Sequence, residues 1–298
     1  MDRVLIIGSN GMLGKDITKC FLNCDRYNVY AINRHMDDKI AEENSFICDI
    51  SDNQILNDVL LKVQPNIIIN CAAIVNVDQC EEDKEFAFRV NSKVNEVLAL
   101  CNTNKAKLVY ISTDSIFNGE KGNYSETDDV EPLNYYAETK LKGEQLILKN
   151  NKEALIIRTN IYGFHSEGAQ SSLCEWAIRN LNENISINGF EDVYFNPLYT
   201  KQLAQIVYEL IQIDCKGIIN VASNNYLSKY EFLIYLCDVF GFDRKLIKKD
   251  KIDNFVFKAK RPKNTTLNIK RLNSIGKYDI SIINGLNMLK SDYERSLR

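Results

Sequence analysis

Near its start the chain carries a glycine-rich turn between a strand-like run and a helix-like run. Residues 3–7 (RVLII) are continuously apolar, as is typical of a parallel strand buried on both faces. Residues 8–14 (GSNGMLG) follow at once, and a helical pattern then extends from 12 to 22. A strand, a glycine turn and a helix in this order predict a dinucleotide-binding unit, because the helix N-terminus then faces the phosphates.

The residues of this turn are expected to have different tasks. Gly8 makes the tight turn, Gly11 lets the backbone approach a pyrophosphate, and Gly14 lets the helix pack on the strand. Cofactor contacts are predicted along the turn at Gly8, Asn10, Gly11, Met12, Leu13 and Gly14. The alternative is a glycine-rich turn that binds nothing.

The end of the second predicted strand, residues 28–32, bears on the choice of cofactor. An acidic side chain at such a strand end would hydrogen-bond the adenosine ribose of NAD and repel a 2'-phosphate. Here Asn33 and Arg34 follow the strand, and a guanidinium is a natural partner for the 2'-phosphate of NADP. The sequence therefore predicts NADPH, with NADH as the alternative cofactor and a plain surface role as the alternative for Arg34.

Strands and helices continue to alternate along the next part of the chain. Further strands are predicted at 45–48, 66–73 and 107–112, and helices at 52–63, 82–101 and 134–148. Asp49 and Ile50 are expected at the edge of the adenine. The small residues Cys71, Ala72 and Ala73 would let the backbone come close to a flat cofactor. This alternation predicts an α/β fold with a doubly wound parallel sheet of the Rossmann type.

A tyrosine and a lysine on the predicted helix 134–148 suggest acid–base chemistry. Tyr136 and Lys140 are four residues apart and so point from one face. An ammonium beside a phenol is expected to lower the phenol pKa. Just upstream, strand 107–112 ends at Thr113 and Asp114, where a hydroxyl could hydrogen-bond a substrate carbonyl. The alternative is an exposed tyrosine beside a solvated lysine.

Composition excludes several classes of protein. The chain of 298 residues is 45% hydrophobic with a formal net charge of -3, which argues against nucleic acid as the main partner. Nine cysteines without a CxxC spacing, and only two histidines, predict reduced thiols and no metal site. No apolar run approaches membrane-spanning length, and no signal peptide is expected because the chain opens on a strand. We therefore expect a soluble cytoplasmic protein that does not bind membranes.

Sequence blocks along nearly the whole chain resemble the extended short-chain dehydrogenase/reductases, and within them the dTDP-4-dehydrorhamnose reductase branch. The blocks are GSNGMLG at 8–14, NCAAIVNVDQCEED at 70–83, STDSIFNG at 112–119, PLNYYAETKLKGE at 132–144, RTNIYG at 158–163 and RPKNTTLN at 261–268. The resemblance implies that Thr113, Tyr136 and Lys140 are the catalytic set. It also implies that Ala72 and Ala73 line the cofactor and that Asn91 helps to order the site.

After residue 160 the alternation loosens, which predicts a second, smaller region. We expect a dinucleotide-binding core at 1–160, with 200–222 returning to it, and an interleaved substrate-binding region at 161–199 and 223–298. Helices are predicted at 166–182, 200–213 and 228–240, and a strand at 217–221. The predicted substrate contacts are Val75, Thr113, Asp114, Ser115, Asn160, His165 and Arg261. The guanidinium of Arg261 suits a nucleotide diphosphate, with an ion pair to the core as the alternative.

The leading hypothesis is an NADPH-dependent reductase acting on the C4 ketone of a nucleotide-activated 4-keto-6-deoxyhexose. An elimination enzyme of the same fold would want a glutamate where Ser115 stands. An epimerase-reductase would want a cysteine where Asp114 stands, although His165 suits it. A rival from another class is a non-catalytic NADP-binding subunit, like the regulatory subunit of methionine adenosyltransferase. The nucleotide base, the sugar, the product stereochemistry and the choice between monomer and homodimer stay open.

Overall fold

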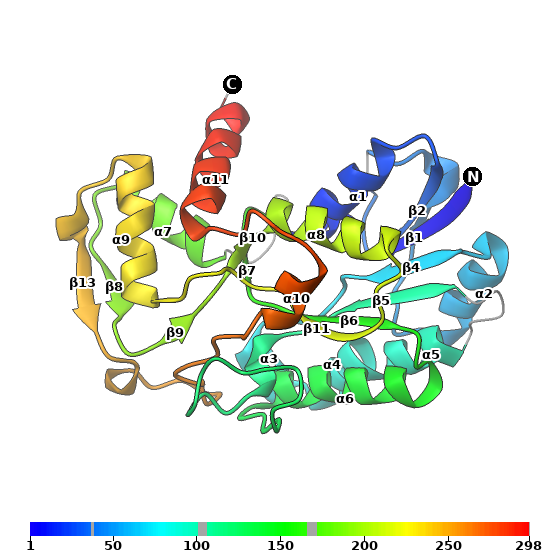
Figure 1. The fold of residues 1–298 in the computed structure, drawn as a ribbon, viewed down its shortest axis with the longest axis horizontal. Helices are drawn as coiled ribbons and strands as arrows, with labels where there is room; N and C mark the ends of the chain where they lie inside the picture. The colour runs from blue at the N-terminus through cyan, green and yellow to red at the C-terminus, as the bar shows by residue number, and fades with distance from the viewer. Residues whose placement is uncertain (37–38, 101–105, 166–171, 298) are drawn as a thin grey trace.

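The computed structural model describes residues 1–36, 39–100, 106–165 and 172–297. Within these ranges, a seven-stranded parallel sheet forms the centre of the molecule in the order β11-β6-β5-β4-β1-β2-β3 (Figure 1). Its strands are β1 (Asp2–Ile7), β2 (Tyr27–Asn33), β3 (Ser45–Ile47), β4 (Ile67–Asn70), β5 (Lys107–Ile111), β6 (Leu155–Arg158) and β11 (Gly217–Asn220). The order reverses between β1 and β4, and in such sheets ligands bind beyond the carboxyl ends of the strands at the reversal. The predicted fold class is confirmed.

The sheet is buried on both faces, as the continuous apolar run of β1 predicts. Val4 and Ile6 pack into one core layer and Leu5 and Ile7 into the other, and all four are fully buried. Each such side chain contributes about 1.5–3 kcal/mol relative to an exposed position. Side chains that alternate between two apolar layers require helices on both sides of the strand.

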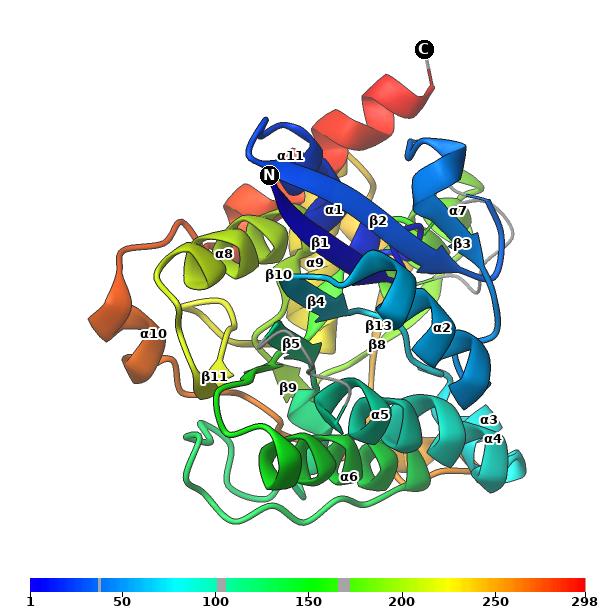
Figure 2. The same ribbon diagram turned by 90° about the vertical axis from the view of Figure 1, so that its right-hand side faces the viewer.

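Two groups of helices supply these layers. On one face lie α1 (Gly14–Leu22) and α8 (Thr200–Gln212), which pack against each other. On the other lie α2 (Asn53–Val63), α5 (Val94–Leu100) and α6 (Tyr135–Asn150). Figure 2, turned by 90°, shows the sheet between the two groups.

The limits of α2 follow from local chemistry, as predicted. The Asp52 side chain accepts hydrogen bonds from the backbone N–H groups of Gln54 at 2.9 Å and Ile55 at 3.2 Å, which caps the helix. The helix ends at Val63, where Gln64 takes a left-handed conformation with φ 45° just before Pro65.

The helix predicted at 82–101 is confirmed from Lys84 to Leu100, with a π-helical turn inside it. The described part of this stretch contains α3 (Val77–Glu82), α4 (Lys84–Phe88), a π-helical segment η2 (Arg89–Lys93) and then α5, while 101 lies outside the described residues. Asp83 separates α3 from this helix, because its side chain caps α4 by accepting from the N–H of Phe86 at 3.0 Å. The wider π-helical turn changes which side chains face inward. Here it includes Asn91, whose side chain is buried.

A smaller region lies on the left of Figure 1 and has its own apolar core. Its helices are α7 (Leu173–Asn182), α9 (Lys229–Phe240) and α11 (Ile282–Ser296). Short paired strands join it: β8 (Ile187–Phe190) with β13 (Ile247–Asp250), and β9 (Tyr194–Phe195) with β12 (Leu227–Ser228). The remaining elements are β7 (Ile161–Tyr162) paired with β10 (Leu198–Tyr199), α10 (Lys270–Ile275), and the short helical turns η1 (Glu42–Asn44), η3 (Asp114–Ile116), η4 (Arg244–Leu246) and η5 (Ile252–Asn254).

Two predicted helices of this region begin at capping boxes. Ser228 caps α9 with Glu231 as its partner, and Ser172 caps α7 with Glu175. The helix predicted at 166–182 begins later, at Leu173, and its first part, 166–171, lies outside the described residues. Across the described ranges, no helix is both long enough and apolar enough to cross a lipid bilayer.

Candidate active site

Thr113 and Tyr136 come together at the carboxyl end of β5. Thr113 is the second residue after the strand, and Tyr136 lies in the first turn of α6, which Asn134 caps by accepting from the N–H of Ala137 at 3.0 Å. The side chain of Thr113 lies close enough to Tyr136 to affect the pKa of its phenol. The Thr113 hydroxyl also donates to Asp114 Oδ1 at 3.2 Å. The structure thus places a hydroxyl and a phenol side by side where the carbonyl of a substrate could accept from both.

Lys140 follows one turn along α6 and is almost fully buried. Its ammonium donates to the carbonyl oxygen of Ile111 at 2.7 Å and lies 4.2 Å from the ring centre of Tyr110. Burial lowers the pKa of Lys140 to about 7, although the Glu144 carboxylate opposes that shift. Lys140 is therefore near its titration midpoint at neutral pH.

The expected effect of Lys140 on the phenol is wrong for this structure. Burial raises the pKa of Tyr136 above its ordinary value, the neighbouring Thr113 side chain opposes that shift, and the nearby Asp114 adds to it. The desolvation of a buried phenolate outweighs the neighbouring charges. Tyr136 is therefore held in its protonated form, which is the form that can donate a proton.

The depressed pKa of Lys140 predicts a pH-dependent stability. In the unfolded chain Lys140 keeps its proton up to about pH 10, whereas in the folded protein it loses it near pH 7. Between these values the unfolded state binds more protons, so folding becomes more favourable as the pH rises. We expect the wild type to gain about 2 kcal/mol relative to Lys140→Met between about pH 7 and 9. Urea unfolding of both proteins at each pH measures it, and a difference that does not change with pH would contradict it.

Asn91, in η2, ties the helix that carries Tyr136 and Lys140 to the loop after β4. Its side chain accepts from the N–H of Ile74 at 2.8 Å and donates to the Ile74 carbonyl at 3.1 Å. It also donates to the hydroxyl of Thr139 on α6 at 3.1 Å. Fully buried amide contacts of this kind fix the position of α6 against the sheet.

The glycine turn has the close approaches that its sequence suggests. Gly8 has φ +79°, and a side chain there would press on the backbone of Ala72 at about 3.1 Å. At Gly14 a Cβ would lie 1.9 Å from the carbonyl oxygen of Gly8, so only glycine fits between strand and helix. Unlike α2, α1 has no side-chain cap within the described residues. These features fit a phosphate group at the start of α1.

The residues at the ends of β2 and β3 have mixed surroundings. Asn33 is buried and supports the turn, because it donates to Ser9 Oγ at 2.7 Å and accepts from the N–H of Asn10 at 3.3 Å. Arg34 is exposed. Asp49 is exposed and accepts from the N–H of Ser51 at 2.9 Å, while Ile50 is buried. Asn33 thus has a structural task in addition to the cofactor contact predicted for it.

The remaining predicted cofactor residues lie close to the turn. Leu13 is buried, and the sulfur-bearing side chain of Met12 packs near Gly163. Cys71, Ala72 and Ala73 are half-buried in the segment after β4, where the Cys71 N–H donates to the Ile7 carbonyl at 2.9 Å. Burial raises the pKa of the Cys71 thiol to about 12, so this cysteine is an inert, protonated group at neutral pH.

Asp114 is the centre of a buried hydrogen-bond cluster. Its Oδ2 accepts from Asn160 Nδ2 at 2.8 Å and from the hydroxyl of Thr265 at 2.5 Å. Its Oδ1 accepts from the hydroxyl of Ser115 at 3.3 Å. Burial raises the pKa of Asp114, and the hydrogen bonds oppose that shift. Of the predicted substrate contacts, Asp114, Ser115 and Asn160 are thus brought together; Thr265, in the RPKNTTLN block, was not predicted.

Arg261 and Val75 lie apart from this cluster in different surroundings. Arg261 donates to Asp78 Oδ2 at 3.0 Å, and its guanidinium carbon is 5.6 Å from the ring centre of Phe257. This ion pair with Asp78 of α3 is the alternative that the sequence analysis gave for Arg261. Val75 is exposed, with 60% of its surface accessible.

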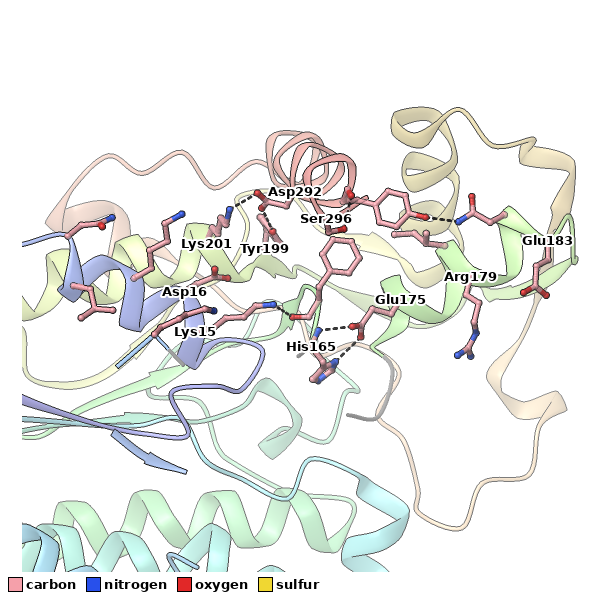
Figure 3. Close-up of a pocket in the computed structure, with 18 residues that line it drawn as sticks. Lys15, Asp16, His165, Glu175, Arg179, Glu183, Tyr199, Lys201, Asp292 and Ser296 are labelled. Carbon is pink, nitrogen blue, oxygen red and sulfur yellow. Dashed lines mark hydrogen bonds and ion pairs between the residues drawn. The ribbon is translucent and has the colours of Figure 1, made fainter. Parts of the chain in front are cut away.

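His165 faces a separate cavity of about 970 Å³ between α1, α7, α8 and α11 (Figure 3). Its backbone N–H donates to Glu175 at 2.6 Å and its Nδ1 lies 2.7 Å from the same carboxylate. On the other side of this cavity, Asp292 accepts from Tyr199 at 2.5 Å and pairs with Lys201 at 2.6 Å. None of Thr113, Tyr136 and Lys140 is among its described lining residues. His165 is thus held by the cap of α7, and its predicted substrate contact stays a prediction.

A buried ion pair behind the site was also not predicted. Arg158 at the end of β6 pairs with Glu144 of α6, with Nη2 2.8 Å from Oε2, and both side chains are at most 4% exposed. Ser112 donates to the same carboxylate at 2.5 Å. Glu144 lies one turn beyond Lys140, so this carboxylate connects the helix of the candidate site to two strands. Both residues stand in the quoted sequence blocks, but nothing local indicates their partner.

A family model described as the RmlD substrate binding domain matches residues 1–283. The chain belongs to this family. The structure of a dTDP-4-dehydrorhamnose reductase from Bacillus anthracis, in complex with NADP, superposes on it with a TM-score of 0.86 at 28% identity. That match covers 98% of this chain and 99% of the other.

Two curated relatives point to different roles within the RmlD substrate binding domain family. The probable low-salt glycan biosynthesis reductase Agl14 of Haloferax volcanii is 28% identical over 278 residues, 90% of each chain. Methionine adenosyltransferase 2 subunit beta of Mus musculus is 28% identical over 283 residues, 92% of this chain and 82% of that protein. The predicted branch of the extended short-chain dehydrogenase/reductases is confirmed. The matches support an NAD(P)-dependent sugar-nucleotide reductase in general.

Proposed function

We propose that this protein reduces the C4 ketone of a nucleotide-activated 4-keto-6-deoxyhexose with NADPH. The observation that carries the proposal is the contact between Thr113 and a protonated Tyr136 at the carboxyl end of β5, one helical turn from the buried Lys140. A ketone oxygen placed against these two hydroxyls gains a hydrogen bond from Thr113 and a proton from Tyr136.

The chain's own residues account for binding and proton transfer. The turn from Gly8 to Gly14 would hold the cofactor pyrophosphate, and Lys140 would hold the nicotinamide ribose. When bound, NADPH supplies the hydride for C4. Tyr136 then donates its phenolic proton to the oxygen on which negative charge develops, and Thr113 stabilises that charge. The raised pKa of Tyr136 suits the reductive direction, since the residue begins each turnover as an acid.

A preference for NADPH is expected to depend on Arg34. Arg34 is exposed at the end of β2, so a charge pair with a 2'-phosphate is worth ~1 to 2 kcal/mol, or roughly ten- to thirtyfold in affinity. We expect Arg34→Ala to remove most of the difference between the NADPH and NADH dissociation constants, measured by fluorescence titration. Arg26→Ala is the matched control, because Arg26 is an exposed arginine at the opposite end of the same strand, paired with Asp2 at 3.2 Å. If the ratio of the NADPH and NADH dissociation constants is unchanged in Arg34→Ala, Arg34 does not determine the cofactor preference.

The second candidate function is a non-catalytic NADP-binding subunit that acts on a partner protein. The observation that favours it is the match to methionine adenosyltransferase 2 subunit beta over 92% of this chain. Against it stand the assembled Thr113, Tyr136 and Lys140, which a regulatory protein would not need. In both cases we propose a cytoplasmic location, which agrees with the free thiols of the eight described cysteines.

A substrate screen separates the two functions. The purified protein is incubated with NADPH and a panel of 4-keto sugar nucleotides that differ in base and sugar, and NADPH oxidation is followed. We expect turnover with at least one member of the panel and none with its 4-hydroxy counterpart. Tight NADPH binding without oxidation on any member would contradict the reductase and favour the regulatory subunit.

A further inference from the structure

Lys229 is a half-buried lysine at the border between the smaller region and the candidate site. It is the first residue of α9, directly after the capping residue Ser228, and its backbone N–H donates to the Val193 carbonyl at 2.9 Å. Its ammonium lies 4.3 Å from the ring centre of Phe195 in β9. A ring face attracts a cation but offers it no hydrogen-bond acceptor in the ordinary sense.

Hydrogen bonds connect this position to the end of β5. The Thr265 N–H donates to the carbonyl of Tyr194, the neighbour of Phe195, at 3.1 Å. The hydroxyl of the same Thr265 donates to Asp114, which follows Thr113. Lys229 is therefore within electrostatic reach of both Asp114 and Arg261, and both charges affect its pKa.

The ammonium of Lys229 has no carboxylate at ion-pair distance among the described residues. Asp114 is the carboxylate whose charge raises the pKa of Lys229, but its oxygens already accept hydrogen bonds from Thr113, Ser115, Asn160 and Thr265. Burial consequently lowers the pKa of Lys229, and Arg261 lowers it further. Keeping an ammonium in such a place is unfavourable unless an anion joins it.

Lys249 of β13 is a useful comparison, because it also lies over an aromatic ring but is exposed to solvent. Its ammonium also lies over an aromatic ring, 5.0 Å from the centre of Tyr230. It is exposed, however, and pairs with Glu191 at 3.6 Å. A lysine over an aromatic ring therefore occurs twice in this region. Lys229 differs from Lys249 because it is less exposed and, among the described residues, has no carboxylate at ion-pair distance.

We infer that Lys229 binds the sugar-linked phosphate of the nucleoside diphosphate portion of the substrate. The inference rests on the proposed function, since it needs a nucleotide-activated sugar whose ketone meets Thr113 and Tyr136. A sugar with its C4 oxygen at that point extends its C1 phosphate to the far side of the ring. Lys229 offers a compact positive charge suited to such a phosphate, and Arg261 stands nearby as a second cation.

Direct nucleotide binding tests the assignment without turnover. The probes are dTDP and UDP, titrated by calorimetry into the full-length protein saturated with NADPH. We expect Lys229→Met to weaken binding of the preferred probe by about tenfold or more, the scale of a charge-assisted hydrogen bond. Lys229→Arg should recover part of the loss, and Lys249→Met should bind as the wild type does. NADPH affinity should be unchanged in all three, and thermal unfolding verifies that each variant is folded.

The outcomes separate this inference from the proposed function. If the wild type and Lys229→Met bind dTDP and UDP equally well, the assignment of Lys229 is wrong, whatever the screen for turnover shows. If Lys229→Met loses binding but no 4-keto sugar nucleotide is reduced, the phosphate site stands and the reductase proposal fails. If the wild type binds neither probe, the assignment of Lys229 is wrong, and the reductase proposal is decided by the substrate screen alone.

Discussion

Replacing Tyr136 by phenylalanine is expected to lower kcat by about a hundredfold or more, the usual scale for losing a positioned proton donor. Phenylalanine keeps the ring and loses the hydroxyl that the Thr113 side chain influences. That hydroxyl matters most when negative charge develops on the substrate oxygen, so NADPH affinity should stay close to that of the wild type. Steady-state kinetics on the substrate found by the screen, with fluorescence titration of NADPH, measure both quantities.

The adjacent tyrosine is a matched control for this variant. Tyr135 occupies the same turn of α6, but its ring lies beneath Lys84 at 5.0 Å and its backbone N–H donates to Glu81 at 2.8 Å. Tyr135→Phe should therefore leave kcat near the wild-type value. If Tyr136→Phe reduced the substrate as fast as the wild type, Tyr136 would not be the proton donor.

The pH profile gives a further check on Tyr136. Because burial raises the pKa of this phenol, it stays protonated throughout the neutral and mildly alkaline range. We expect no loss of kcat from its deprotonation below the ordinary phenol value of ~10. This corrects the expectation from sequence, where a nearby ammonium predicted a lowered pKa.

Removing the Glu144 carboxylate should have the largest effect on stability. Glu144→Ala leaves the guanidinium of Arg158 buried without its partner, and breaking one side of a buried pair costs about 3–5 kcal/mol. Urea unfolding at constant pH measures the loss. Glu138→Ala is the control, because Glu138 is exposed on the same helix and its removal should change the free energy of unfolding by no more than about 0.5 kcal/mol.

A double variant tests whether the loss of stability comes from the unpaired charge of Arg158. In Glu144→Leu combined with Arg158→Met both charges are gone, so no unpaired ion remains in the interior. Apolar replacement of a whole buried pair is often neutral or stabilising. The double variant should therefore be more stable than Glu144→Ala. If Glu144→Ala had the same free energy of unfolding as the wild type, the prediction that an unpaired Arg158 destabilises the fold would be wrong.

The sequence by itself determined the parts of this protein that depend on neighbours along the chain. The apolar run of β1 predicts burial on both faces, and Val4 and Leu5 indeed enter opposite core layers. Asp52 and Pro65 mark the two ends of α2. Tyr136 and Lys140 share a helix, as their spacing suggests. These features follow from backbone geometry, capping and periodicity, which act over a few residues.

Only the tertiary structure decided the features that depend on distant partners. Asn91 lies in a π-helical turn of the predicted helix, and its side chain contacts Ile74 and Thr139. The pKa of Tyr136 rises because the folded chain removes water from the phenol, which no spacing rule reports. Arg158 pairs with Glu144, and Lys229 comes within electrostatic reach of Asp114, only after the sheet has brought separate segments together. Burial and long-range pairing arise from the packed chain, and for that reason local sequence patterns could not predict them.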